Sequence, residues 1–175
     1  VPAGPVVDDQ IAKLRPLLGP GDLIIDAGNA NYTDTERRAR ETAADAFDFM
    51  GIGVSGGEDG ARHGPSIMAG GDVAHWQRVG PLPEAISAKY NGEPRAALMG
   101  PGGAGHFVKM VHNGIEYADM QMIAETYAVM RDGLGFDASA VAATFEAWNK
   151  GPLASYLVEI SGKVARATDP ISGGP

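Results

Sequence analysis

The stretch that decides the fold is residues 96–117, AALMGPGGAGHFVKMVHNGIEY. Its first residues read as a short strand, and the Gly-Pro-Gly-Gly cluster that follows interrupts regular structure. From Ala104 to about Asp132 the apolar residues recur at helical spacing. The stretch therefore predicts a domain boundary, with a domain of strands and helices at 1–102 and the start of a helical domain at 103–175.

Upstream of this boundary, short β-branched runs alternate with helical stretches. The predicted strands are 23–25, 49–54, 66–68 and 96–99, and the predicted helices are 8–18, 35–46 and 72–79, with Thr35 as the N-cap of the second. Such alternation is typical of parallel strands joined by right-handed crossovers. Ligands of these sheets bind at the carboxyl ends of the strands.

Downstream of the boundary, the spacing predicts one long helix over 104–132 and two more over 137–149 and 152–168. Gly133 and Gly135 are the stop signals for the first. The predicted fold class is α/β followed by all-α: the later half of a Rossmann-like parallel sheet domain, then the first long helices of an all-helical domain.

Composition and charge narrow the function classes. The 175 residues carry 22 acidic against 14 basic side chains, a net charge of -8, so the surface has no general attraction for nucleic acid or anionic membranes. There is no cysteine, which excludes disulfides, thiolate zinc sites and cysteine nucleophiles. With no signal peptide near Val1 and no membrane-length apolar run, we expect a cytoplasmic protein whose chain begins upstream of this sequence.

The predicted long helix carries the strongest chemical signal. Lys109, His112, Asn113, Glu116 and Tyr117 stand at i, i+3, i+4, i+7 and i+8, so they share one face. A solvated face is the simplest interpretation of such a strip. Solvated faces are rich in Glu, Lys and Arg, however, so the His, Asn and Tyr side chains favour a ligand cleft.

The opposite face of the same helix is apolar and is expected to pack against a core. Its residues are Val111, Gly114, Ile115, Ala118 and Met122.

Two of the polar residues could act on one small ligand. Lys109 and Glu116 are two turns apart, about 10 Å along the helix axis. A lysine that accepts a proton and a carboxylic acid that donates one form an acid/base set across a substrate. His112 and Glu116 could instead bind a metal, but no other histidine has a spacing that recruits it, so we expect no metal site.

Two loops after predicted strands are further candidates. Asn29 follows the first strand and offers both a donor and an acceptor. Ser55, Gly56 and Gly57 end a glycine-rich run whose backbone N–H groups could approach an anion, although a tight turn without a ligand explains them equally well. Because the carboxyl ends of parallel strands share one edge, we expect both loops to face the cleft lined by the long helix.

Three runs of the sequence resemble the 6-phosphogluconate dehydrogenase family, and the likeness extends over essentially the whole chain. They are DAGNANYTDT at 26–35, GVSGGEDGARHGPS at 53–66 and GAGHFVKMVHNGIEY at 103–117. The resemblance implies oxidative decarboxylation of 6-phosphogluconate to ribulose 5-phosphate in the pentose phosphate pathway, with NADP as hydride acceptor and NAD not excluded. It also implies that this chain is the middle of a longer, homodimeric enzyme.

The same resemblance implies a role for each candidate residue. Lys109 would be the general base that takes the proton of the substrate 3-hydroxyl, and Glu116 the acid that protonates C1 once carbon dioxide has left. The phosphorylated sugar acid would be bound by Asn29, Ser55, Gly56, Gly57, His112, Asn113 and Tyr117, the last of which reaches the phosphate. The cofactor-contacting positions would be Val1, Pro2, Ala3 and Asn29.

Two alternatives stay open. Another β-hydroxyacid dehydrogenase would share the glycine-rich strand end and the helix lysine, and a non-catalytic binding or assembly module would keep the fold alone. The dinucleotide fingerprint G-x-G-x-x-G, which follows the first strand of such a domain, is expected upstream of Val1. We therefore expect the isolated chain to bind neither cofactor nor substrate usefully, and to be inactive by itself.

Overall fold

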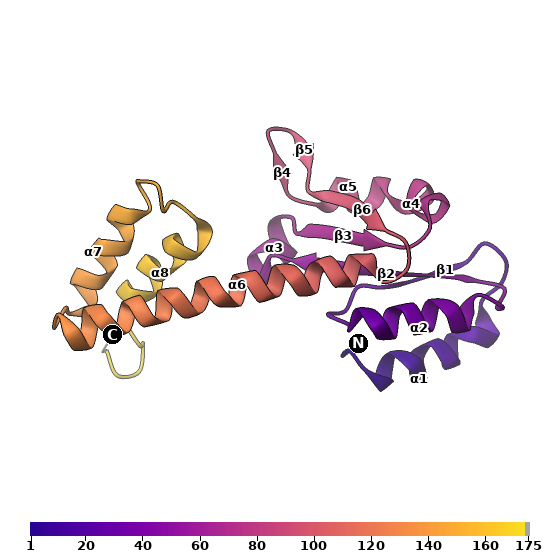
Figure 1. The fold of residues 1–175 in the computed structure, drawn as a ribbon, viewed down its shortest axis with the longest axis horizontal. Coiled ribbons are helices and arrows are strands. Elements are labelled where there is room, and N and C mark those ends of the chain that lie inside the picture. Colours follow the sequence, from indigo (N-terminus) through magenta and orange to yellow (C-terminus); the bar gives the residue numbers. More distant parts are fainter. Residues whose placement is uncertain (174–175) are drawn as a thin grey trace. The chain divides into compact units, whose positions relative to one another are not determined.

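The computed structural model describes residues 1–173 and divides the chain into two units. The first unit is Val1–Asn113 and the second begins at Gly114, so the chain passes from one to the other inside helix α6, Ala104–Ala128 (Figure 1). The first unit has the strands and the second is helical, which confirms the predicted order of α/β followed by all-α.

The first unit is built on a four-stranded sheet in the order β1-β2-β3-β6. Its strands are β1 (Leu23–Asp26), β2 (Asp48–Ser55), β3 (Ser66–Gly70) and β6 (Ala96–Gly100). Around them are α1 (Pro5–Leu14), the 3-10 turn η1 (Arg15–Leu17), α2 (Tyr32–Thr42), α3 (Gly57–His63), α4 (Val73–Val79) and α5 (Pro81–Ile86). A separate hairpin joins β4 (Lys89–Tyr90) to β5 (Glu93–Pro94).

The sheet is mixed rather than parallel throughout. β1 pairs with β2, and β3 with β6, in parallel as predicted, but β2 and β3 are antiparallel and Ser55 lies opposite Ser66. The prediction of parallel strands was wrong for this pair. The chain between Ser55 and Ser66 holds only the short helix α3, and a parallel crossover needs a dozen or more residues.

One face of β2 changes from large to small side chains along its length. Phe49, Gly51 and Gly53 alternate with Met50, Ile52 and Val54, so they share a face. Phe49 belongs to a buried cluster with Val7, Ile11 and Phe47, against which Ile24 and Ala39 pack. The glycines further along the strand leave room for another element to approach the sheet.

Helix α2 begins earlier than the sequence predicted. Asn31 is its N-cap, because the Asn31 side chain accepts a hydrogen bond from the backbone N–H of Thr33 at 3.0 Å. Thr35, the predicted cap, lies within the helix and is fully buried. The prediction of Thr35 as N-cap was therefore wrong, since Asn31 offers an equally good capping side chain one turn earlier.

The second unit contains the rest of α6, a π-helical turn at Val129–Gly133, α7 (Ala138–Trp148) and α8 (Tyr156–Arg166). Met130, Val141 and Phe145 form its buried core, with Ile123, Trp148, Val158 and Ala165 packed against them. The predicted helix over 152–168 starts only at Tyr156, because the Ser155 side chain caps α8 by accepting from Val158 N–H.

The apolar face of α6 is exposed in this structure. Ile115 is 61% exposed and Met122 is 58% exposed, and Val111 lies at 43%. The prediction that this face packs against a core was therefore wrong for the residues described. Helical spacing identifies an apolar face, but it carries no information on what covers that face.

Candidate active site

The first turns of α6 lie directly on the backbone of β2 and β3. A Cβ placed at Gly105 would stand 2.6 Å from the Gly70 nitrogen and 2.8 Å from the Ala69 carbonyl carbon. One at Gly53 would collide with the Cβ of Lys109, and one at Gly51 would lie 2.7 Å from Nδ1 of His106. We call these three glycines and Gly70 the glycine seat of α6. They set the distance between the helix and the sheet.

Lys109 is buried, with 8% of its surface exposed. Its Nζ donates a hydrogen bond of 2.5 Å to Oδ1 of Asn113, one turn further along α6. An amide NH₂ does not accept hydrogen bonds, so this bond also determines which way the Asn113 amide is turned. The lysine therefore has one defined position at the end of β2.

His112 connects this pair to the end of β2. Its Nε2 lies 3.3 Å from Oγ of Ser55, and its Nδ1 lies 3.4 Å from Oδ1 of Asn113. Because a carbonyl oxygen only accepts, Nδ1 carries the proton in the second contact. We call Ser55, Lys109, His112 and Asn113 the Lys109 cluster, and the structure brings all four to one side of the sheet.

The turn after Ser55 depends on two glycines. Gly56 has φ of 136° and Gly57 has φ of 58°, both in the region that disfavours other residues. The Gly56 carbonyl accepts a bond of 2.7 Å from Gly60 N–H, which closes the first turn of α3. Gly56 and Gly57 are exposed beside Ser55, so their backbone is open to a ligand.

Asn29 lies on the neighbouring loop, after β1. Asp26 Oδ1 accepts from Gly28 N–H at 3.0 Å, which turns the chain immediately before Asn29 and leaves that residue exposed. A cavity of about 520 Å³ beside this turn is lined by Val1, Asp26, Ala27 and Gly28, among others. The structure thus places Val1 next to the loop of Asn29, while Pro2 and Ala3 are exposed.

The loop of Asn29 and the loop after Ser55 begin at different positions along the strand direction. Asp26, the last residue of β1, pairs with Gly51, and β2 continues for four residues to Ser55. Asn29 and the Lys109 cluster therefore lie at the ends of neighbouring strands of the same sheet.

Glu116 and Tyr117 follow on α6 but belong to the second unit. Tyr117 is 64% exposed, and Glu116 is partly buried. Their predicted roles as acid and phosphate ligand stay predictions.

Sequence reasoning missed a buried polar group beneath the site. Thr35, Arg38 and His106 are each at most 1% exposed, and His106 Nδ1 lies 2.7 Å from Thr35 Oγ1. Burial lowers the pKa of the His106 imidazole, while the charge of Asp26 acts in the opposite direction. The signal was present in the sequence, since His106 stands one turn before Lys109 and so shares its face of the helix.

Arg38 ties this region to α1. Its Nε donates to Asp8 at 2.8 Å, and its Nη2 donates to the Gly4 carbonyl at 2.8 Å. The hydrogen bond from Arg38, with a second from Arg37, lowers the pKa of Asp8 to about 2. The start of α1 is thereby fixed beside α2.

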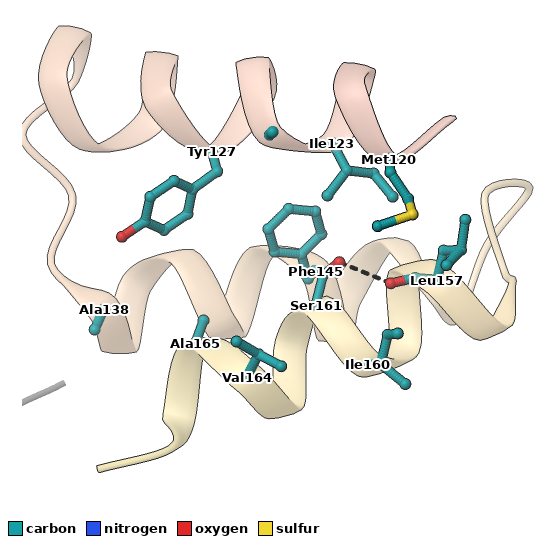
Figure 2. Close-up of a pocket in the computed structure, with 11 residues that line it drawn as sticks. Met120, Ile123, Tyr127, Ala138, Phe145, Leu157, Ile160, Ser161, Val164 and Ala165 are labelled. Atoms are coloured by element: carbon teal, nitrogen blue, oxygen red, sulfur yellow. Dashed lines mark hydrogen bonds between the residues drawn. The ribbon is translucent and has the colours of Figure 1, made fainter. Parts of the chain in front are cut away.

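The second unit contains a cavity of its own, of about 450 Å³ (Figure 2). Side chains from α6, α7 and α8 surround it, among them Met120, Phe145 and Ile160, and the walls are almost entirely apolar. The hydroxyl of Ser161 donates a hydrogen bond of 2.7 Å to the Leu157 carbonyl, so its proton is already used within α8. None of the predicted site residues lines this cavity.

Residues 1–173 hold neither a metal-binding cluster nor a helix suited to cross a membrane. They contain no group of three or more His, Cys, Asp or Glu side chains arranged to hold a metal ion. No helix within them has both the length and the apolar character to cross a membrane.

Comparison with known proteins assigns the chain to a family. Residues 1–100 match the NAD binding domain of 6-phosphogluconate dehydrogenase, and residues 105–175 match the C-terminal domain of 6-phosphogluconate dehydrogenase. The chain belongs to the 6-phosphogluconate dehydrogenase family. The resemblance predicted from the three sequence runs is confirmed.

Named relatives in this family include decarboxylating 6-phosphogluconate dehydrogenases from Drosophila melanogaster and Bacillus licheniformis. They are 53% identical over 97% of this chain and 50% identical over 100% of it, respectively. A relative from Bacillus subtilis, 49% identical over 100% of this chain, is described as NAD(+)-dependent. The chain spans 35 to 38% of the length of these three relatives.

A solved structure of 6-phosphogluconate dehydrogenase from Plasmodium falciparum matches with a TM-score of 0.92 and 40% identity, over 99% of this chain and 37% of that one. That enzyme is described in its apo form and in complexes with NADP+ and 6-phosphogluconate. A 3-hydroxyisobutyrate dehydrogenase from Mycobacterium tuberculosis matches with a TM-score of 0.73 at 23% identity, over 100% of this chain and 56% of that one. This second likeness shows the fold alone.

Proposed function

We propose that this chain supplies catalytic and binding residues for the oxidative decarboxylation of 6-phosphogluconate to ribulose 5-phosphate, with hydride transfer to NADP. The observation that carries the proposal is the Lys109 cluster, in which a buried lysine is held by Asn113 beside Ser55 and His112. Family membership and the NADP+ and 6-phosphogluconate complexes of the Plasmodium falciparum enzyme support it.

In this proposal Lys109 is the base at the substrate 3-hydroxyl. When that proton is taken and the hydride on C3 passes to the nicotinamide, C3 becomes a ketone and the product is a β-keto acid. Its carboxylate leaves as carbon dioxide while the electron pair of the broken bond flows into the ketone, so the step needs neither a metal nor an imine. Glu116 then protonates C1 of the resulting enediol.

The remaining predicted residues bind the reactants. Ser55, Gly56, Gly57, His112, Asn113 and Asn29 hold the sugar acid, and Tyr117 reaches its phosphate. Val1, Pro2, Ala3 and Asn29 contact the nicotinamide cofactor, which when bound supplies the hydride acceptor, and NAD is not excluded in place of NADP. The exposed Asn29 amide and the nearby Val1 carbonyl, which would lie 3.6 Å from a Cβ at Gly28, fit such contacts.

The wider setting is part of the same proposal. The complete enzyme acts as a cytoplasmic homodimer in the pentose phosphate pathway, and the domains divide at 1–102 and 103–175. The isolated 175 residues are expected to be inactive and to bind neither cofactor nor substrate usefully, because they span only 35 to 38% of the length of these relatives.

The test is turnover of 6-phosphogluconate by the full-length protein that carries this chain, with Lys109→Met as the decisive variant. Loss of a positioned base costs about 10²- to 10⁴-fold in kcat. Lys13→Met, at an exposed lysine near the end of α1, is the matched control and should keep wild-type turnover. Normal turnover by Lys109→Met would remove this lysine from the mechanism.

A substrate panel separates the alternatives. Turnover of an unphosphorylated β-hydroxyacid such as 3-hydroxyisobutyrate, with none of 6-phosphogluconate, would indicate another β-hydroxyacid dehydrogenase. A well-folded full-length protein that turns over neither would indicate the binding or assembly module.

A further inference from the structure

A histidine with no predicted role lies one helical turn before Lys109. His106 is 1% exposed, and its Nδ1 lies 2.7 Å from Oγ1 of Thr35, a residue of α2 that is 0% exposed. The imidazole also lies on Gly51 of β2, where an added Cβ would be 2.7 Å from Nδ1 and 2.9 Å from Cε1. The ring is therefore held against the sheet and against α2 at once.

The contact with Thr35 connects two segments that both carry predicted site residues. Helix α2 begins at Tyr32, only three residues after Asn29, so its first turn determines where that loop ends. Lys109 follows His106 by one turn of α6 and packs its Cβ against Gly53. One buried hydrogen bond thus spans from the segment after Asn29 to the helix of Lys109.

Neighbouring contacts join the same two helix starts. The rings of Tyr32 and Phe107 meet edge to face, with centroids 5.2 Å apart. A Cβ at Gly103 would lie 2.6 Å from the Tyr32 carbonyl oxygen, so α6 begins in close contact with α2. Of these contacts, only the one between His106 and Thr35 is a hydrogen bond between side chains. Because a hydrogen bond is directional, this contact defines how α6 is positioned along α2.

We propose that His106 is a positioning residue for the reaction, whose hydrogen bond to Thr35 sets the position of Asn29 relative to Lys109. The inference rests on the function proposed above. Both side chains are buried away from any ligand, so they act through the residues that they hold. A displacement of about 1 Å between reacting groups costs about 100-fold in rate, so a bond that fixes this distance affects turnover as well as stability.

The test uses two substitutions at Thr35 in the full-length protein. Thr35→Val keeps the shape of the side chain and removes the hydroxyl, whereas Thr35→Ser keeps the hydroxyl. We expect Thr35→Val to lower kcat by about 10- to 100-fold and Thr35→Ser to stay within about threefold of wild type. The primary isotope effect with 6-phosphogluconate deuterated at C3 should rise in Thr35→Val, because hydride transfer then limits turnover.

The isotope effect separates positioning from instability, since a protein that is only less stable loses active molecules without changing it. A folded Thr35→Val with wild-type kcat and isotope effect would overturn the proposal. Equal losses in Thr35→Val and Thr35→Ser would also overturn it, because they would assign the effect to packing against Gly51.

A second measurement does not depend on activity. Amide hydrogen exchange at Phe107 and Lys109 in the full-length protein should be at least about tenfold faster in Thr35→Val than in Thr35→Ser. If the wild type fails to oxidise 6-phosphogluconate, the function proposed above is wrong, and this exchange comparison alone then decides whether the His106 bond positions α6. Equal exchange in the two variants would overturn the link.

Discussion

Asn113 is the residue through which the rest of the Lys109 cluster is connected. Its Oδ1 accepts from Lys109 and lies within reach of His112, which in turn meets Ser55. The helical spacing of these residues in the sequence was enough to place Lys109, His112 and Asn113 on one face. Their connection to Ser55 is a contact between residues 57 positions apart in the chain, and helical periodicity cannot predict a contact between such distant segments.

Asp8 gives a prediction for acid stability. The hydrogen bond from Arg38, then that from Arg37, lowers the pKa of Asp8 to about 2 from an ordinary value of 3.8. A depressed carboxyl pKa stabilises the fold above the unfolded value and loses that contribution as the pH falls through the folded one. We expect Asp8→Asn to be less stable than wild type at pH 5, and the difference to shrink towards pH 2.

Urea unfolding midpoints of the 175-residue chain at several pH values would measure this. Asp9→Asn, one residue further along α1 and exposed, is the control and should follow wild type. A gap between Asp8→Asn and wild type that stays constant down to pH 2 would show that the Asp8 charge does not cause it.

At the scale of the elements, the accuracy of prediction followed the strength of the local signal. The strands and the long helix were located within a few residues, because their apolar patterns are local. The β4–β5 hairpin was missed although Asn91-Gly92, both at positive φ, is a strong turn signal. The antiparallel pairing of β2 and β3 was missed because strand–helix alternation is typical of parallel strands, although the residues between Ser55 and Ser66 are too few for a parallel crossover.

A glycine of α6 that belongs to the glycine seat and one that does not should respond in opposite ways to substitution by alanine. Gly105→Ala would press a methyl group against the backbone of Met68 and Gly70, which cannot move aside. We expect a loss of about 1 to 3 kcal/mol in stability. Gly114→Ala meets nothing within 4 Å and should instead stabilise the helix by about 0.5 to 1 kcal/mol.

Both variants of the 175-residue chain can be compared by urea unfolding followed by circular dichroism. The opposite signs of the two stability changes provide the internal control, because a general effect of alanine in α6 would change the stability of both variants in the same direction. A neutral Gly105→Ala would mean that the helix does not approach the sheet as closely as described.

At the scale of the whole molecule, each unit has a hydrophobic cluster of its own. Val7, Ile11, Phe47 and Phe49 belong to the first, and Met130, Val141 and Phe145 to the second. The sequence predicts a domain boundary at 102–103 from the Gly-Pro-Gly-Gly cluster, and the compact units of the structure divide at Asn113 and Gly114, within α6. A helix that runs through a division leaves no glycine- or proline-rich signal at that point, so sequence reasoning could not locate it.

Separate cores predict separate unfolding. Val141→Ala, at a residue 1% exposed in the second unit, should cost about 2 kcal/mol there. Amides of α7 should then exchange with solvent about 30-fold faster, while those of β2 stay unchanged. Val164→Ala, at 71% exposure on α8, is the control and should change neither. Equal acceleration in β2 and α7 would show that the two units unfold as one.

The glycine seat also bears on how this protein can evolve. Gly51, Gly53, Gly70 and Gly105 meet their neighbours so closely that even a methyl group collides at each. In a library of random variants, these four positions should be depleted of every substitution, whereas His112 and Asn113, which are not locked in this way, can vary among folded members. A lineage that changes its substrate can therefore exchange the side chains on α6 one at a time, but moving the helix away from the sheet requires several coordinated mutations.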